Sequence, residues 1–162
     1  NHKIQIAFKP HPILKLKLYN HTEWGKERTD QYYLRWATMQ NCQLEEGDYD
    51  DLFLTSDALI HDSISFISEY CFTGKPALFT VSDKKIADRF NVFGTKAFQL
   101  SYMAYNESDI CQFVENVVLN GNDSRKNERQ TFVNDILKPP HNQTAVSNII
   151  NDLVENIWQK EQ

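Results

Sequence analysis

The stretch of sequence that decides the fold runs from Ser56 to Phe79 and reads S-D-A-L-I-H-D-S-I-S-F-I-S-E-Y-C-F-T-G-K-P-A-L-F. Within it, residues 57–61 form an apolar run that is typical of a buried strand, and residues 62–65 form a polar turn. The apolar residues between 66 and 72 predict a helix that a glycine ends, and residues 77–81 predict a second strand. This order of strand, turn, helix and strand is a βαβ unit, which favours a parallel sheet with helices on its faces.

Further short elements are predicted on both sides of this unit. Strands are predicted at residues 3–8 and 41–45, and helices at residues 13–19, 22–39, 83–90, 110–119, 124–137 and 144–159, while residues 91–105 read as irregular. In the second helix, Tyr32, Tyr33, Trp36 and Met39 are spaced to form one apolar side. We therefore predict an α/β fold with three or four parallel strands, helices on the faces of the sheet and a helical C-terminal tail. Residues 1–162 are expected to form one domain that includes a helical tail from about residue 108 to 160.

Length and charge narrow the classes of function. A chain of 162 residues fits one domain, and its 17 basic and 22 acidic residues give a net charge of −5. Nucleic-acid binders carry a concentrated basic face, so this composition argues against a nucleic-acid partner. No apolar run approaches the ~20 residues of a membrane span. Cys42, Cys71 and Cys111 lack the spacing of metal ligands, and we interpret them as reduced thiols of a cytoplasmic protein.

The polar turn after residues 57–61 is the most informative candidate site. Ser63 and Ser65, together with backbone N–H groups at the start of the predicted helix, form a natural cradle for a phosphate or diphosphate. In open α/β sheets, ligands bind outside the carboxyl ends of the strands, where this turn lies. Glu69, one turn into the helix, is placed to accept hydrogen bonds from a ribose. The alternative is that Ser63 or Ser65 caps the helix with Glu69 as its capping-box partner, and spacing alone leaves both open.

A second polar segment, F-K-P-H-P at residues 8–12, also follows a predicted strand. Prolines on both sides hold His11 on a stiff turn, and Lys9 adds a positive charge nearby. A histidine there is placed to donate a hydrogen bond to a phosphate oxygen or to protonate a leaving group. The alternative is a histidine that is merely exposed in a loop. Because both polar segments follow strands of the predicted parallel sheet, we expect them at the same edge of that sheet.

These segments resemble those of a known family. The stretch from Ser56 to Phe79 resembles the "S-D-x-L-I-x-D-x-x-S … K/R-P" stretch of the CDP-glycerol glycerophosphotransferase family, the polymerases and primases of teichoic-acid and capsule synthesis. The upstream K-P-H-P at residues 9–12 is similar to the H-P turn of that family. The later R-Q-T-F at residues 129–132 and N-Q-T-A-V-S-N-I at residues 142–149 are similar to its closing "R-x-x-F … A-S-x-R-I" segment. The landmarks occur in the order of the family and span most of the chain.

The resemblance implies a GT-B architecture of two Rossmann-like halves, and this chain is expected to be the C-terminal half that binds the nucleotide-activated donor. Such a half is expected to be a Rossmann-like three-layer domain with a parallel sheet of three to five strands. It implies that His11 is catalytic, contacting the donor diphosphate or assisting the departure of CMP. It places Asp62, Ser63 and Ser65 at the donor phosphates and Glu69 at the ribose. The implied donor is CDP-glycerol or a related polyol phosphate, which acts as a substrate, so that no cofactor and no metal are expected in this half.

Three residues depart from the pattern of the family. In the closing segment, Asn148 stands where an arginine is often found. The other two lie at the polar turn. His61 stands where threonine or serine is usual, and Ile64 replaces one hydroxyl of a common pair of serines. The donor therefore stays open among CDP-glycerol, CDP-ribitol and the UDP- or CMP-sugars of neighbouring GT-B enzymes. An alternative of a different class is a non-catalytic, flavodoxin-like binding module. A receiver-type module is disfavoured, because the first strand ends in Lys9-Pro10-His11 and not in an acidic pair.

The start of the chain at Asn1, without a methionine, indicates a piece of a longer protein. We expect the missing N-terminal half of the same polypeptide to supply the acceptor-side catalytic base and to bind a lipid-linked or glycan acceptor. The isolated piece is accordingly expected to be an inactive part of a transferase. A cytoplasmic location is expected, and peripheral attachment of the full-length protein to the inner face of the cell membrane stays open.

Overall fold

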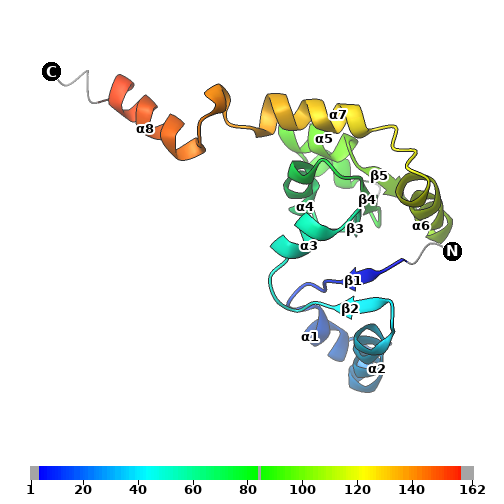
Figure 1. The fold of residues 1–162 in the computed structure, drawn as a ribbon. Helices are drawn as coiled ribbons and strands as arrows, with labels where there is room; N and C mark the ends of the chain where they lie inside the picture. Colours follow the sequence, from blue (N-terminus) through cyan, green and yellow to red (C-terminus); the bar gives the residue numbers. More distant parts are fainter. Residues whose placement is uncertain (1–3, 84, 158–162) are drawn as a thin grey trace. The chain divides into compact units, whose positions relative to one another are not determined.

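The computed structural model describes residues 4–83 and 85–157 (Figure 1). The chain divides into two compact units, residues 1–56 and residues 57–162, and each is described by itself. Both units combine helices with parallel strands, which confirms the predicted α/β class. Three predicted elements extend over positions outside the described residues, namely Lys3, Lys84 and residues 158–159.

The first unit contains a two-stranded parallel sheet. Strand β1 (Ile6–Phe8) pairs with β2 (Cys42–Leu44), in the register that places Ile6 opposite Cys42. Helices α1 (Leu14–Tyr19) and α2 (Gly25–Thr38) connect the two strands, and α3 (Asp50–Thr55) follows β2. Both strands and the first two helices thus occur where the sequence predicts them, with shorter bounds.

An aromatic cluster forms the core of the first unit. The ring of Phe8 in β1 lies 5.7 Å from Tyr32, 6.0 Å from Tyr33 and 4.9 Å from Trp36, measured between ring centroids. The predicted apolar side of α2 is therefore correct for these three residues. It is wrong for Met39, which is 44% exposed. The helix ends at Thr38 and Met39 has an extended backbone, so its side chain leaves the helical spacing.

The second unit contains a three-stranded parallel sheet in the order β3 (Leu59–His61), β4 (Ala77–Thr80) and β5 (Tyr102–Ala104). Leu59 lies opposite Ala77, and Leu78 lies opposite Tyr102. Helix α4 (Phe66–Glu69) continues as the 3₁₀ turn η1 (Tyr70–Thr73) and connects β3 to β4. The predicted βαβ unit is confirmed.

Helices cover both faces of this sheet, because neighbouring residues of a strand point to opposite sides. On the Phe79 face lie α4, α5 (Val92–Gln99) and α7 (Lys126–Phe132), and the buried core residues there are Ile67, Cys71, Phe79, Ala97, Leu100 and Phe132. On the Leu78 face lie α6 (Glu107–Gln112) and the π-helical η3 (Phe113–Leu119), and the buried core residues there are Leu78, Ala104, Phe113 and Val117. The second unit thus has the three layers of a Rossmann-like domain.

Two features of the fold differ from the expectation. The strands are divided between two sheets, one in each unit. Residues 91–105, which read as irregular, contain both α5 and β5. Asn91 begins α5 by accepting a hydrogen bond from the backbone N–H of Gly94 at 2.8 Å, and β5 is held by its parallel pairing with β4. The helix predicted from residue 83 is only the 3₁₀ turn η2 (Ile86–Arg89).

The chain ends in a series of helices. The π-helical η4 (Val133–Leu137) continues α7, a short 3₁₀ turn η5 (Pro140–Asn142) follows, and α8 (Ala145–Asn156) is the last helix. Thr144 caps α8 by accepting a hydrogen bond from the backbone N–H of Ser147 at 3.1 Å. One side of α8 is apolar but exposed, and it consists of Val146, Ile149, Ile150, Leu153 and Val154. No helix within the described ranges is both long and apolar enough to cross a membrane.

Candidate functional site

The bend between β3 and α4 brings together three of the predicted site residues, Asp62, Ser63 and Ser65. Asp62 and Ser65 are exposed and Ser63 is half-buried. Ser65 occupies the N-cap position of α4, but its hydroxyl makes no capping hydrogen bond. Among the described residues, neither serine hydroxyl has a hydrogen-bond partner. The capping interpretation of the serines is therefore wrong, and their hydroxyls remain available to a ligand.

The backbone of the same bend offers further donors. The N–H groups of Ser63, Ile64 and Ser65 have no acceptor within the part of the chain that the structure describes. Two hydroxyls and three successive N–H groups thus lie together at the carboxyl end of β3. Successive backbone N–H groups in a turn are a recurring way to hold an oxyanion. The bend has the donor set that a phosphate group requires.

His61 is the last residue of β3 and lies directly before this bend. Its side chain is 8% exposed, and its ring packs edge-to-face on Phe79 with 5.3 Å between centroids. The Nδ1 atom of His61 lies 3.0 Å from the carbonyl oxygen of Ser63, and the hydroxyl of Thr80 donates to the carbonyl oxygen of His61 at 3.3 Å. Burial lowers the pKa of the imidazole to about 4, so the ring is uncharged at neutral pH.

Glu69 ends α4, about one turn beyond the bend. It is exposed, while Ile67 and Tyr70 on either side of it along the helix are buried. The side chain is therefore presented to solvent and not to the core.

A groove of about 250 Å³ adjoins the bend at Ile64. It is lined by α4 on one side and by the start of α5 on the other, and its lining residues are Ile64, Ile67, Ser68, Arg89, Phe90, Asn91, Phe93, Gly94 and Ala97. The groove is mostly apolar, and Ile64 is the residue that it shares with the bend. A bound group larger than a phosphate would find apolar contact surface there.

His11 belongs to the first unit, where it follows β1 and precedes α1. Its side chain is exposed, and its Nδ1 atom accepts a hydrogen bond from the backbone N–H of Ile13 at 3.3 Å. Its carbonyl oxygen accepts a second one from Leu14 at 2.8 Å, which begins α1. Because Nδ1 is an acceptor, the proton of the neutral ring sits on Nε2. His11 therefore presents a donor to solvent and is at the same time part of the local turn.

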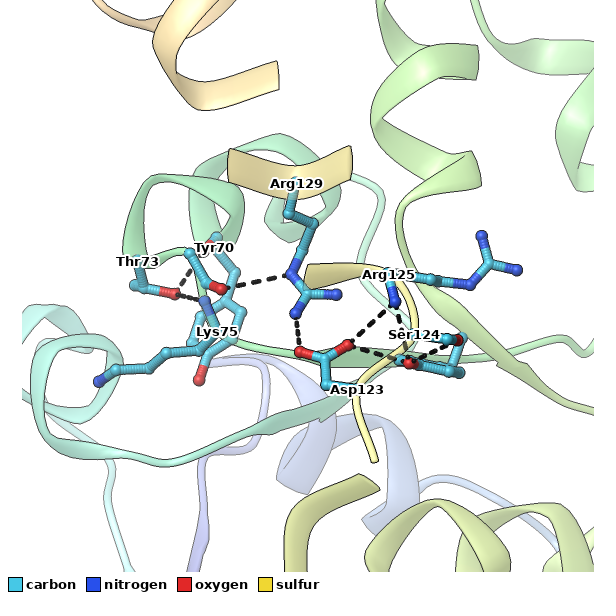
Figure 2. A network of polar contacts seen from close by, with 9 residues as sticks. Tyr70, Thr73, Lys75, Asp123, Ser124, Arg125 and Arg129 are labelled. Atoms are coloured by element: carbon cyan, nitrogen blue, oxygen red, sulfur yellow. Dashed lines mark hydrogen bonds and ion pairs between the residues drawn. The ribbon is translucent and has the colours of Figure 1, made fainter. Parts of the chain in front are cut away.

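The second unit also contains a buried ion pair that sequence reasoning missed. Arg129 of α7 is 1% exposed and pairs with Asp123, whose side chain is 12% exposed. The Nε–H of Arg129 donates to the carbonyl oxygen of Gly74 at 3.4 Å (Figure 2). Asp123 in turn accepts a hydrogen bond from the hydroxyl of Tyr102 at 2.9 Å. Arg129 thus connects α7 to the end of η1 and to the loop before α7, and Asp123 extends this connection to the start of β5.

Gly74, whose carbonyl oxygen accepts the hydrogen bond from Arg129, lies in a sharp turn of the backbone. Gly74 has a φ of +69°, a left-handed conformation that side chains disfavour, and it turns the chain from η1 toward β4. Thr73 supports the same turn, because its hydroxyl donates to the carbonyl of Tyr70 at 2.7 Å and accepts from the backbone N–H of Lys75 at 3.1 Å (Figure 2). The turn that carries Gly74 is therefore held from within as well as by Arg129.

A model of the CDP-glycerol:poly(glycerophosphate) glycerophosphotransferase family matches residues 1–156, nearly the whole chain. The chain belongs to this family. The comparisons with curated proteins and with solved structures found no match. The resemblance of the sequence motifs is thereby confirmed, and the molecule contains a glycerophosphotransferase-type domain of a transferase family.

The R-Q-T-F segment at residues 129–132 presents two of its side chains to the core of the second unit. Arg129 and Phe132 are both buried, and Gln130 and Thr131 between them are exposed. Spacing of three residues places the first two on the same face of α7. The spacing in the sequence could have indicated this inward face, but Asp123 and Gly74 as partners of Arg129 follow only from the tertiary structure.

Proposed function

We propose that this chain binds the nucleotide-activated donor, CDP-glycerol, of a glycerophosphotransferase. The observation that supports this proposal most strongly is the set of unpaired donors in the bend at residues 62–65. A diphosphate carries oxyanions that such donors match, and the family description names CDP-glycerol. The adjoining apolar groove offers contact surface for the rest of the ligand.

In the proposed reaction, an acceptor hydroxyl attacks the phosphorus of the glycerol-phosphate unit. A new oxygen–phosphorus bond forms, the bond between that phosphorus and the bridging oxygen breaks, and CMP leaves with the electron pair. Negative charge therefore grows on the phosphate of the leaving CMP. Donors that are already in place in the bend stabilise this charge without reorganisation, which is the main contribution we assign to Ser63 and Ser65.

The other predicted site residues take supporting roles in this proposal. His11 would donate from Nε2 to the donor diphosphate or to the departing CMP, a role that agrees with its exposed ring. Glu69 would accept hydrogen bonds from the ribose hydroxyls, since its carboxylate faces solvent beyond the bend. Asp62 would shape the bend at its first position.

We extend the proposal to the complete protein as a polymerase of teichoic acid or capsular polysaccharide with a GT-B architecture. In that protein a second half of the polypeptide would bind a lipid-linked or glycan acceptor and supply the catalytic base. The complete enzyme would act in the cytoplasm, at the inner face of the membrane. These assignments rest on the family description and on the predicted motifs.

Removal of the two hydroxyls of the bend tests the proposal. We expect the double substitution Ser63→Ala and Ser65→Ala to weaken binding of CDP-glycerol about a hundredfold or more, because each of the two lost hydrogen bonds to a charged group contributes about 1.5–3 kcal/mol. Calorimetric titration of the chain with CDP-glycerol, CDP-ribitol, CMP and a UDP-sugar measures the affinity and identifies the donor class.

Ser108→Ala is the matched control, because Ser108 is exposed on α6 at the other face of the sheet. It should leave both the affinity and the melting temperature unchanged. A folded chain that binds none of the four nucleotides, or a double variant that binds as tightly as the original chain, would contradict the proposal.

A further inference from the structure

His61 is buried, unlike Asp62, Ser63 and Ser65 in the bend. One of its two ring nitrogens makes a hydrogen bond within the described residues and the other does not. Nδ1 lies 3.0 Å from the carbonyl oxygen of Ser63. Nε2 is buried, and within the described residues it has no hydrogen-bond partner. The rings of Phe79 and Phe66 lie 5.3 and 6.4 Å from the imidazole, measured between centroids.

These contacts determine the protonation of the ring. A carbonyl oxygen only accepts hydrogen bonds, so the contact with Ser63 requires a proton on Nδ1. A second proton on Nε2 would place a charged N–H group among apolar rings without an acceptor, which is costly. The ring is therefore the neutral tautomer with its proton on Nδ1. Desolvation lowers the pKa of His61 to about 4, in agreement with this assignment.

The hydrogen bond of His61 spans the first residues of the bend. It connects the last residue of β3 to the carbonyl of Ser63, two residues further on. That carbonyl belongs to the peptide group that carries the N–H of Ile64, one of the three unpaired donors. Holding the carbonyl in one direction therefore holds the N–H in the opposite direction, because a peptide group is planar.

We propose that His61 is a positioning residue, which as an uncharged imidazole protonated on Nδ1 fixes the orientation of the donors at residues 63–65. The inference rests on the proposed function, because it assigns these donors to the donor diphosphate. In this role, His61 does not contact the ligand and carries no charge. It raises the affinity for the ligand because it holds the bend in one conformation before the ligand binds.

Three substitutions of His61 separate positioning from packing. His61→Asn keeps an N–H near the place of Nδ1, because its amide group lies at the same distance along the side chain. His61→Gln carries its amide one bond further, toward the place of Nε2. His61→Phe keeps the ring and its contacts with Phe79 but removes both nitrogens. The affinity for CDP-glycerol is measured by calorimetry and the melting temperature by circular dichroism.

We expect His61→Asn to bind CDP-glycerol within about threefold of the original chain, and His61→Phe and His61→Gln to bind about fivefold to tenfold more weakly. His61→Phe should keep the original melting temperature at pH 7, since its ring fills the same apolar site. Equal loss of affinity in the Asn and Phe variants would overturn the inference. So would unchanged affinity in His61→Phe.

Nitrogen NMR of the imidazole gives an independent readout that needs no ligand. The original chain should show a protonated Nδ1 and an unprotonated Nε2 for His61 at pH 7, and the opposite tautomer would refute the inference. The amide resonances of residues 63–65 should move in His61→Phe and stay near their original positions in His61→Asn. If CDP-glycerol fails to bind at all, the proposed function fails, while these spectra still decide whether His61 orients the bend.

Discussion

The two histidines near strand ends, His11 and His61, use their ring nitrogens in opposite ways. His11 is exposed and accepts a hydrogen bond at Nδ1, so that Nε2 carries the proton. His61 is buried and donates from Nδ1, so that Nε2 carries none. Only His11 therefore presents a donor to a ligand in solvent. The partner of Nδ1, and not the residue type, decides what each imidazole can do.

The role of His11 can be tested with a pair of variants. His11→Asn keeps an acceptor at the place of Nδ1 and hence the turn that begins α1, but it lacks Nε2. His11→Ala loses both. If Nε2 binds the donor diphosphate, both variants should weaken the binding of CDP-glycerol by a similar factor of about ten. If His11 only supports the turn, calorimetry should show a loss in His11→Ala alone.

The buried imidazole of His61 makes stability depend on pH. Its pKa is about 4 in the folded chain and about 6.5 when exposed, so between these values the unfolded chain binds the extra proton. The stabilising contribution is complete above pH 6.5 and is lost as the pH falls toward 4. We expect this group to lower the free energy of unfolding by about 3 kcal/mol between pH 7 and pH 4.

Denaturant unfolding at pH 7, 5 and 4 measures this contribution as a difference. Carboxylates also titrate in this range, and a comparison with His61→Phe removes their effect because both proteins share them. The variant should lose less stability on acidification than the original chain. If the original chain and His61→Phe lose the same free energy of unfolding on acidification, the imidazole is not buried in its neutral form.

Arg129 connects α7 to two neighbouring loops. Its partners are Gly74, directly after η1, and Asp123, in the loop after η3, so the helix cannot move away without separating a buried charge pair. Removing one member of such a pair leaves the other charge buried and unpaired. We expect Arg129→Met to lower the free energy of unfolding by about 3–5 kcal/mol, measured by denaturant unfolding.

The chain offers a matched control for this change. Arg89 pairs with Asp83 at 2.9 Å, but both side chains are largely exposed, at 63% and 42%. Arg89→Met should therefore cost less than about 1 kcal/mol. A double variant that also replaces Asp123 by Leu should recover part of the loss of Arg129→Met, because no unpaired charge remains. An equal cost of the Arg89 and Arg129 substitutions would show that burial does not determine the strength of the pair.

Elements that depend on local signals could be predicted from the sequence. The strand before Asp62, the helix after Ser65 and the glycine that ends it follow from the apolar pattern and from turn chemistry. Strand β5 was not predicted from the sequence; it contains no β-branched residue, and pairing with β4 holds it extended. The same division holds for the site. The place of Ser63 and Ser65 in the turn after β3 could be predicted from the sequence, whereas the hydrogen bond of His61 appears only in three dimensions.

At the scale of the whole molecule, each unit has a core of its own. The first packs aromatic rings of α2 on Phe8, and the second packs helices on both faces of β4. The sequence predicted strands in both parts of the chain but could not assign them to separate sheets. An apolar run predicts that a strand is present, but only the three-dimensional pairing shows which other strand lies next to it.

Cys71 can report chemically on how often the core of the second unit opens to solvent. Cys71 lies in the core on the Phe79 face, and burial raises the pKa of its thiol to about 11. Cys111 is exposed on α6, and Cys42 is half-buried in the first unit. Alkylating reagents consume thiolates, so the rate at which Cys71 is modified follows the opening of that core. Pulsed alkylation with mass spectrometry can thus time the unfolding of this unit in the unaltered protein, with Cys111 as its internal reference.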